Sequence, residues 1–167
     1  EERAGLPLTR VFKDHVSEDG RGGWMPPKHL KDHTPVYMGQ EILPPSLRSA
    51  ILSFVLACAA REARGQGAKH SSMLVHVTRY THVQKEVHRQ VVDFVKKTKL
   101  RITRAIDHQA LLDELHELWE TDFVPTTSAI AHQLTESEEP LTAQPWSDVL
   151  IKLSDVLSDI EVRMVNG

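Results

Sequence analysis

The chain has 167 residues, of which 40% are hydrophobic, and a formal net charge of -3. A chain of this length buries one sizeable core, so we expect one domain. A single cysteine, Cys58, excludes a disulfide framework and favours a reducing, cytoplasmic location. The longest apolar run, near residues 46–60, is too short and too interrupted by arginine to cross a bilayer, so we expect no membrane partner.

Charge is unevenly distributed along the sequence. Residues 79–104 hold eight Lys and Arg against two Asp and Glu, whereas residues 105–161 hold one Lys against thirteen Asp and Glu. This asymmetry is typical of a surface that faces a polyanion beside an acidic surface. The alternative is that the acidic helices fold against the basic segment or face water.

The first quarter of the chain differs in composition from the rest. Residues 1–44 are rich in Gly, Pro, His and charged residues, and they predict an extended, loop-rich lead-in. A helix is expected to start at Pro44-Pro45-Ser46, with Ser46 as its N-cap, and to end at the glycines of residues 64–67. Its expected inner stripe is Leu47, Ile51, Phe54, Val55 and Cys58.

Two short apolar segments, residues 73–78 and 160–166, predict β-strands. Most of the chain between them has helical periodicity, beginning with a helix at 81–97 in which Thr81 and Gln84 have the spacing of a capping box. A strand, several helices and a second strand predict a parallel pair joined by a right-handed helical crossover. Two strands alone do not form a sheet that is stable in water, so the sheet requires further strands.

The expected fold class is therefore α/β and mostly helical. Residues 45–167 form the single domain, with a helical insertion at about 100–159. Within the insertion Pro125 interrupts the helical pattern, and a shorter helix is expected from Thr127 to Leu134. A last helix begins at Pro145, with the expected inward residues Trp146, Val149, Leu150, Leu153, Val156 and Leu157.

A histidine stands at every sixth position of HSSMLVHVTRYTHVQKEVHRQ, residues 70–90. Two histidines six residues apart on a helix lie roughly 240° apart around its axis, so they do not converge on one ion. Metal-binding pairs on a helix need a spacing of three or four, which this stretch lacks. We therefore predict no metal site here, and a metal-dependent nuclease built from histidines and acidic residues is the least supported function.

Motifs that carry catalysis are also missing from the sequence. It contains no Gly-x-x-x-x-Gly-Lys-Ser/Thr loop for phosphate binding. The common nuclease core needs an Asp or Glu two residues before a Lys, and this pair does not occur. We expect no catalytic residue in this chain.

Three segments of the sequence resemble the Z1 (Z-one) domain family: PPSLRSAILSFVLACAAREARGQG, HSSMLVHVTRYTHVQKEVHRQV and the closing VRMVNG. The resemblance covers roughly residues 35–96 and 160–167, and the acidic middle matches in length and helical character. The family occurs in large bacterial proteins that are classed as endonucleases and linked to superfamily-two helicases. The chain also begins without methionine and ends just after an expected strand, so we expect it to be part of a longer protein.

The resemblance implies a fragment of a RecA-like lobe in a bacterial restriction or defence system. The chain would be a non-catalytic segment that forms the start of the second motor lobe. Its partners would be other lobes of the same chain and, weakly, nucleic acid. ATP and Mg²⁺ would bind elsewhere in the parent protein, and no cofactor is expected in this segment.

The resemblance also implies where nucleic acid would bind. The first expected strand ends at Thr78 and Arg79, and by analogy with the helicases this end faces the nucleic-acid backbone. Arg79 would contact phosphate with assistance from Thr78. Lys85, Arg89 and Lys96 share a face of the following helix by their spacings of four and seven. The alternative for Arg79 is a solvated surface arginine. The alternative function is a helical protein-interaction module with an acidic docking face at residues 105–159.

Overall fold

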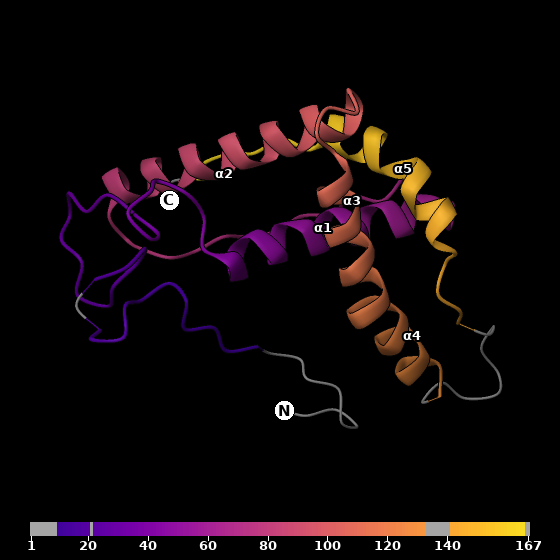
Figure 1. The fold of residues 1–167 in the computed structure, drawn as a ribbon, viewed down its shortest axis with the longest axis horizontal. Coiled ribbons are helices and arrows are strands. Elements are labelled where there is room, and N and C mark those ends of the chain that lie inside the picture. Colours follow the sequence, from indigo (N-terminus) through magenta and orange to yellow (C-terminus); the bar gives the residue numbers. More distant parts are fainter. Residues whose placement is uncertain (1–9, 21, 133–140, 166–167) are drawn as a thin grey trace.

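The computed structural model describes residues 10–20, 22–132 and 141–165, which form helices joined by loops and extended segments (Figure 1). In chain order the helices are α1 (Pro45–Ala63), α2 (Thr81–Thr103), α3 (Gln109–Leu118), the π-helical turn η1 (Trp119–Phe123), α4 (Val124–Ala131) and α5 (Trp146–Asp159). No helix in these ranges is long and apolar enough to cross a membrane.

Helix α1 lies at the centre of the molecule and separates two hydrophobic clusters. Its residues Leu52, Val55 and Leu56 join α3, η1 and α5 in the first cluster. Ile51 joins α2 and the lead-in in the second. Because α1 packs on both sides, its apolar residues surround the axis instead of forming one stripe.

The predicted start and end of α1 are confirmed, but its N-terminus is stabilised differently from the prediction. The N-cap position is Pro44, and no side chain caps the helix there. Instead, Ser46 donates to the carboxylate of Asp14 from its backbone N–H at 2.7 Å and from its hydroxyl at 2.6 Å. A carboxylate is favourable at this position because the first N–H groups of a helix carry partial positive charge.

The lead-in is anchored to α2 by buried aromatic and apolar side chains. Trp24 and Met25 are buried among Val83 and Val87 of α2. Between Tyr37 and Gln40 the chain forms an isolated bridge through two backbone hydrogen bonds, of 2.8 and 3.0 Å. The described part of residues 1–44 thus forms part of the second core cluster, although it contains no helix.

Helices α3 and α4 are joined by η1 into one rod that projects from the body (Figure 1). Pro125 does not end the helix as the sequence predicted. Proline lacks an N–H, and in a regular α-helix its ring would clash with the carbonyl of Thr121, four residues earlier. A regular α-helical turn is therefore unfavourable there. The backbone widens instead, and the Val124 N–H bonds to the Trp119 carbonyl five residues back.

The predicted α/β fold is wrong. Residues 73–78 and 160–165 are extended, but neither forms a strand, and the described ranges contain no sheet; residues 166 and 167 lie outside those ranges. Both segments pack on the second cluster, through Val75 and Val77 in one and through Ile160 and Val162 in the other, without pairing as strands. With no parallel pair and no crossover between strands, a fragment of a RecA-like lobe is not supported.

Two further expectations about helices need correction. Helix α2 continues to Thr103, beyond the predicted end at Lys97. In α5 the predicted inward residues Val149, Leu153, Val156 and Leu157 are buried, whereas Leu150 is exposed. The reason is that α5 buries one narrow stripe against α1 and α2, and Leu150 lies outside it.

Candidate nucleic-acid interface

Thr78 lies at the corner where the extended segment meets α2, and it is buried, with 6% exposure. Its hydroxyl oxygen accepts the Tyr80 N–H at 3.2 Å and lies 2.7 Å from Nε2 of His29. Its carbonyl accepts a hydrogen bond from Nε2 of Gln84 at 2.9 Å. The polar groups of Thr78 therefore hold the start of α2 and the lead-in together, and the hydroxyl is already engaged.

The bonds of His29 define its role at this corner. Its Nδ1 lies 2.8 Å from the carbonyl oxygen of Pro26, which can only accept, so Nδ1 carries a proton. In the neutral ring Nε2 then accepts the hydroxyl proton of Thr78. His29 thus ties the lead-in to the corner that precedes α2.

The predicted capping box at this corner does not form. Helix α2 begins at Thr81 as expected, but its N-cap residue is Tyr80, and no side chain makes a capping hydrogen bond at this end of the helix. Gln84 reaches past Thr81 to the Thr78 carbonyl. The same Gln84 therefore stabilises the corner before the helix instead of the first helical N–H groups.

Arg79 is exposed beside this corner. Its guanidinium carbon lies 5.3 Å from the centre of the Tyr80 ring, and Nη2 is 3.4 Å from the Tyr80 hydroxyl. The hydrogen bond to Tyr80 raises the pKa of Arg79 above its ordinary value. The stacked arrangement leaves part of the guanidinium edge open to solvent.

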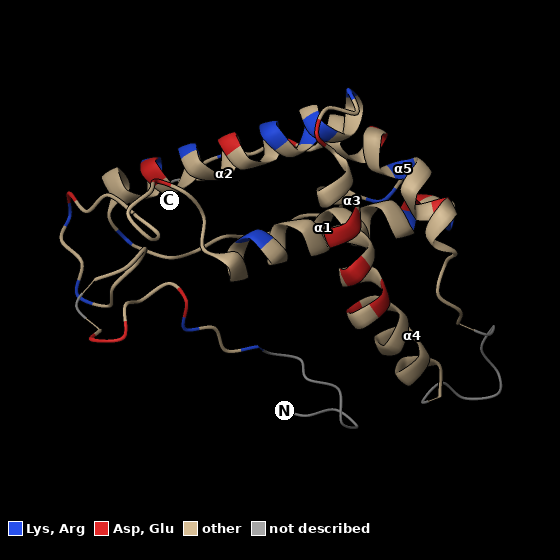
Figure 2. Ribbon diagram, viewed as in Figure 1, with Lys and Arg blue, Asp and Glu red and all other residues tan. Residues whose placement is uncertain are grey.

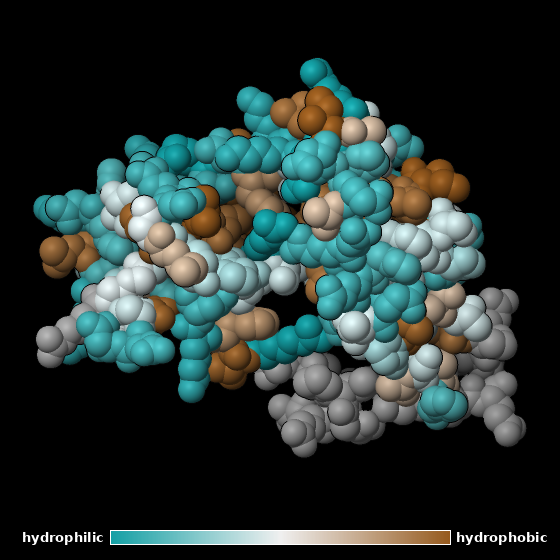
Figure 3. Space-filling view, viewed as in Figure 1, coloured by the Kyte–Doolittle hydropathy of each residue, from teal (hydrophilic) through white to brown (hydrophobic). Residues whose placement is uncertain are grey.

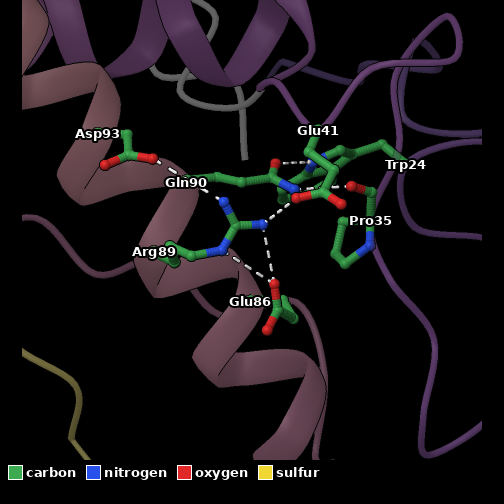
Figure 4. Close-up of polar contacts among 7 residues, drawn as sticks. All are labelled: Trp24, Pro35, Glu41, Glu86, Arg89, Gln90 and Asp93. Carbon is green, nitrogen blue, oxygen red and sulfur yellow. Dashed lines mark hydrogen bonds and ion pairs between the residues drawn. The ribbon is translucent and has the colours of Figure 1, made fainter.

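Lys85 and Arg89 share one face of α2, but their surroundings differ. Lys85 is exposed on that face, and no carboxylate of the described residues lies within ion-pair distance of it. Arg89 is surrounded by the carboxylates of Glu41, of Glu86 at 2.9 Å and of Asp93 at 3.9 Å (Figure 4). The bonds to Glu86 and then Glu41 raise the pKa of Arg89.

The sequence-predicted set is thus only partly brought together. Thr78 and Arg79 are adjacent at the corner, and Lys85 follows one turn into α2. Arg89 is engaged by acidic neighbours, two of which stand three residues before it and four residues after it in the sequence. That spacing is a signal of intrahelical ion pairs that the sequence analysis did not use.

The C-terminal half of α2 carries the remaining cations of the basic segment 79–104. Lys99 donates to the Ser158 carbonyl at 3.2 Å, and Arg101 donates to the Asp107 carbonyl at 2.8 and 2.6 Å. Lys96, Lys97 and Arg104 are exposed, and within the described ranges none of them has an ion-pair partner. Blue residues mark this end of the helix in Figure 2.

The α3–η1–α4 rod carries the opposite charge. Red residues mark the α3 and η1 part of the rod in Figure 2, whereas α4 carries none. Glu114 pairs with Arg48 of α1, Asp122 pairs with Arg10, and Glu120 lies 3.5 Å from His116. Some of the acidic residues therefore hold the rod to the body, and Asp113 and Glu117 remain exposed.

The histidines do not gather into a metal site. In the described parts of the chain no three His, Cys, Asp or Glu side chains are placed to hold a metal ion. The sequence analysis overlooked one pair at a spacing of four, His29 and His33, whose ring centres lie 5.6 Å apart. Both rings bond to the protein instead, since Nε2 of His33 lies 2.9 Å from the Trp24 carbonyl oxygen.

The chain was compared with protein families, with curated proteins and with solved structures, and only the families gave a match. Neither the curated proteins nor the solved structures contain a match to this chain. The model of the Z1 domain matches residues 46–167, which include all the helices described above apart from Pro45, the first residue of α1. Since this match covers well over half of the chain, the protein belongs to the Z1 domain family.

Proposed function

We propose that this chain is a non-catalytic helical segment of a nucleic-acid-handling protein, and that it contacts the phosphate backbone weakly through α2. The observation that carries the proposal is the row of exposed cations on the solvent-facing side of this helix, which lack carboxylate partners among the described residues: Lys85, Lys96, Lys97 and Arg104. Arg79 extends the row beyond the N-terminus of α2.

The positions of these cations support contact with a backbone more than with bases. Lysines at spacings of eleven residues, such as Lys85 and Lys96, return to nearly the same side of a helix. A helix that presents cations along its length matches a line of phosphates, and such contacts carry little base preference. The acidic rod opposes the approach of a polyanion, so the isolated chain binds only weakly.

The wider context is proposed from the family resemblance. The parent protein would be a helicase-like endonuclease of a bacterial restriction or defence system, with ATP and Mg²⁺ bound outside this chain. Its other lobes would be the further partners, and the cytoplasm its location. The role as the start of a second motor lobe is not retained, because the strands on which it depended do not form.

Fluorescence anisotropy with a labelled oligonucleotide tests this proposal. At low salt we expect a Kd of about 10⁻⁴–10⁻⁶ M that weakens steeply as salt is added. The double variant Lys96→Glu/Lys97→Glu should lower the slope of log K against log salt by about two. Arg79→Ala should lower it by about one.

A matched control is Lys31→Glu, which changes the same kind of charge on the exposed surface of the lead-in. This variant should retain most of the affinity, because Lys31 is not part of α2. If Lys31→Glu and Lys96→Glu/Lys97→Glu weaken binding equally per charge, net charge alone explains the binding. The proposed interface is then incorrect.

A second candidate function is a helical protein-interaction module. The observation in its favour is that α4 projects from the body and has no buried residue. The exposed carboxylates Asp113 and Glu117 of α3, in the same rod, would then form part of the docking face. Charge reversal of Asp113 and Glu117 should abolish capture of a partner while leaving oligonucleotide affinity equal or higher, which separates this function from the first.

A further inference from the structure

The extended segment of residues 71–77, between α1 and α2, has a backbone without hydrogen bonds to any described residue. The nearest bonds lie outside it: Arg61 donates to the His70 carbonyl at 3.5 Å, and Gln84 donates to the Thr78 carbonyl. Backbone N–H and C=O groups in folded proteins are nearly always paired with protein or water. Seven consecutive residues thus leave both backbone edges open.

The side chains of this segment alternate as they would in a strand. Val75 and Val77 pack against the second cluster, whereas Leu74 is 81% exposed and His76 is also exposed. Successive side chains of an extended chain point to opposite sides, so one side is already seated on the core. An extended segment that is packed on the core and has unpaired backbone N–H and C=O groups can pair with another strand.

Exposed apolar side chains also occur elsewhere, including Val165 in the extended C-terminal segment, where the Val162 carbonyl already lies 3.4 Å from Nε2 of His88. Figure 3 shows them at several separate places on one face of the molecule. Met38, Ile106 and Ile151 are exposed, but they lie in a turn, a loop and a helix and not in an extended segment. Only backbone groups in an extended chain can pair with an extended partner.

A cavity adjoins the C-terminal end of the segment. It has a volume of about 540 Å³, and His76 and Val77 line it together with Phe12, Trp24 and Met25. Cavities of this size with a mainly apolar lining are suited to one or two apolar side chains. A chain that lay along residues 71–77 would bring a side chain to this cavity.

The charge around the segment is positive. Residues 68–80 include Lys69 and Arg79 and no Asp or Glu. The side chain of Arg61 in α1 also contacts Ser71 at the start of the segment. Cations therefore lie at both ends of the open edge, and they favour acidic residues in whatever binds there.

We propose that residues 71–77 are a docking edge for an extended peptide of a partner protein, which adds to this edge as a β-strand. The peptide would have apolar residues in alternation, acidic residues at its two ends, and one apolar side chain in the cavity beside His76. Main-chain hydrogen bonds would supply affinity, and the cavity and the flanking charges would supply specificity. This inference does not depend on the proposed contact with nucleic acid.

Amide hydrogen exchange of the whole 167-residue chain tests the inference, with a synthetic peptide of alternating valine and threonine and an aspartate at each end. A peptide of about ten residues spans the segment, since an extended chain advances roughly 3.3 Å per residue. Saturating peptide should slow exchange by at least about tenfold at alternate amides of residues 71–77, because one edge of a strand presents every second N–H.

Two proline variants sharpen the test. Met73→Pro and Leu74→Pro each remove one N–H, and neighbouring N–H groups point to opposite edges. One of the two variants should therefore abolish the protection and the other should retain it. Neither variant removes a hydrogen bond between described residues, so the helical circular dichroism signal should remain unchanged. Leu74→Thr keeps the N–H and is the matched control.

Three results would overturn the inference. The first is the absence of protection at millimolar peptide while the helices remain folded. The second is protection that survives both proline variants. The third is protection without peptide that grows with protein concentration, which identifies a second copy of the chain as the occupant. A peptide with lysines in place of the aspartates should bind several-fold more weakly, and equal binding would contradict the charge argument.

Discussion

The carboxamide of Gln90, in the middle of α2, accepts the indole N–H of Trp24 at 2.7 Å (Figure 4). The same carboxamide donates from Nε2 to the carbonyl of Pro35 at 2.7 Å. Gln90 is only 3% exposed, so one polar side chain satisfies two buried groups of the lead-in. Two segments that are remote in sequence are joined to α2 at a single residue.

Replacing this side chain should be costly. In Gln90→Ala the Trp24 N–H and the Pro35 carbonyl lose their partners while they stay buried, and each unsatisfied group costs about 1–3 kcal/mol. We expect the free energy of unfolding to fall by about 2–4 kcal/mol in urea denaturation. Lys85→Ala, on the exposed side of the same helix, should change it by less than about 0.5 kcal/mol. Equal losses in the two variants would show that the lead-in is not held by Gln90.

The bond between Thr78 and His29 gives a second prediction. Thr78→Val keeps the shape of the side chain but removes the hydroxyl that His29 and the Tyr80 N–H share. The unfolding free energy should fall by about 1–3 kcal/mol, because both partners lose a hydrogen bond in a partly buried place. Thr78→Ser retains the hydroxyl and should recover more than half of the loss. A role of Thr78 in phosphate binding alone would instead leave stability unchanged in both variants.

The thiol of Cys58 provides a pH-dependent prediction. Burial raises the pKa of this thiol above its ordinary value, and the negative charge of Glu62 raises it further. The hydrogen bond to Ser71 and the positive charge of Arg61 lower the pKa by smaller amounts. A raised pKa in the folded state means that unfolding releases a proton at alkaline pH. The stabilising contribution is complete below the pKa of the unfolded thiol, about 8.5, and is lost as pH rises through the folded pKa.

Two measurements check this behaviour. The rate of Cys58 alkylation by iodoacetamide should rise with pH to a midpoint above that of a free cysteine, since the thiolate is the nucleophile. Cys58→Ala should also flatten the fall of stability between about pH 8.5 and pH 10. An alkylation midpoint at or below that of free cysteine would contradict the effect of burial.

Burial within α1 distinguishes two neighbouring positions. Leu52 is fully buried in the first cluster, whereas Phe54, expected in the inner stripe, is only partly buried. Leu52→Ala should therefore cost about 2–5 kcal/mol in the free energy of unfolding. Phe54→Ala should cost less than the 3–5 kcal/mol typical of a fully buried phenylalanine. The reverse order in thermal denaturation would place Phe54 in the core.

The sequence predicted those features of the fold that depend on residues close together in the chain, such as helix ends. The start of α1 follows from Pro45, and its end follows from Gly65, which has a φ of +73°. The extended form of residues 73–78 also follows from their apolar, β-branched composition. Pairing into a sheet did not follow, because it depends on whether two remote backbones approach each other, which apolarity does not specify.

The candidate site shows the same division. The intrahelical pairs of Arg89 with Glu86 and Asp93 are visible in the spacing of the sequence. The third carboxylate, from Glu41, is 48 residues away, and no periodicity connects it to α2. The bond of Thr78 to His29, 49 residues away, is equally remote. Arg89 is paired with a carboxylate that is remote in sequence, whereas Lys85 on the same face of α2 has no such partner among the described residues.

The widened turn η1 has two possible causes, and one substitution separates them. Pro125 removes an N–H and crowds the carbonyl of Thr121, whereas Trp119 and Phe123 stack with ring centres 5.2 Å apart and would themselves favour the wide turn. We expect Pro125 to be the cause, because the missing N–H lies directly after the turn. In Pro125→Ala the new amide should bond to the Thr121 carbonyl and restore a regular α-helix. Such a bond adds about 0.5–1.5 kcal/mol of stability.

Hydrogen exchange and backbone chemical shifts read the outcome directly. In Pro125→Ala the amide at position 125 should exchange slowly, and residues 119–125 should show the shifts of an α-helix. Removing the extra residue from the turn should also rotate α4 by about 100° relative to α3, which spin labels on the two helices would detect. Thr126→Ala keeps the proline and should leave the turn unchanged. If the amide at position 125 exchanges rapidly and the turn stays wide, the aromatic stack maintains it, and Phe123→Ala should then restore the regular helix.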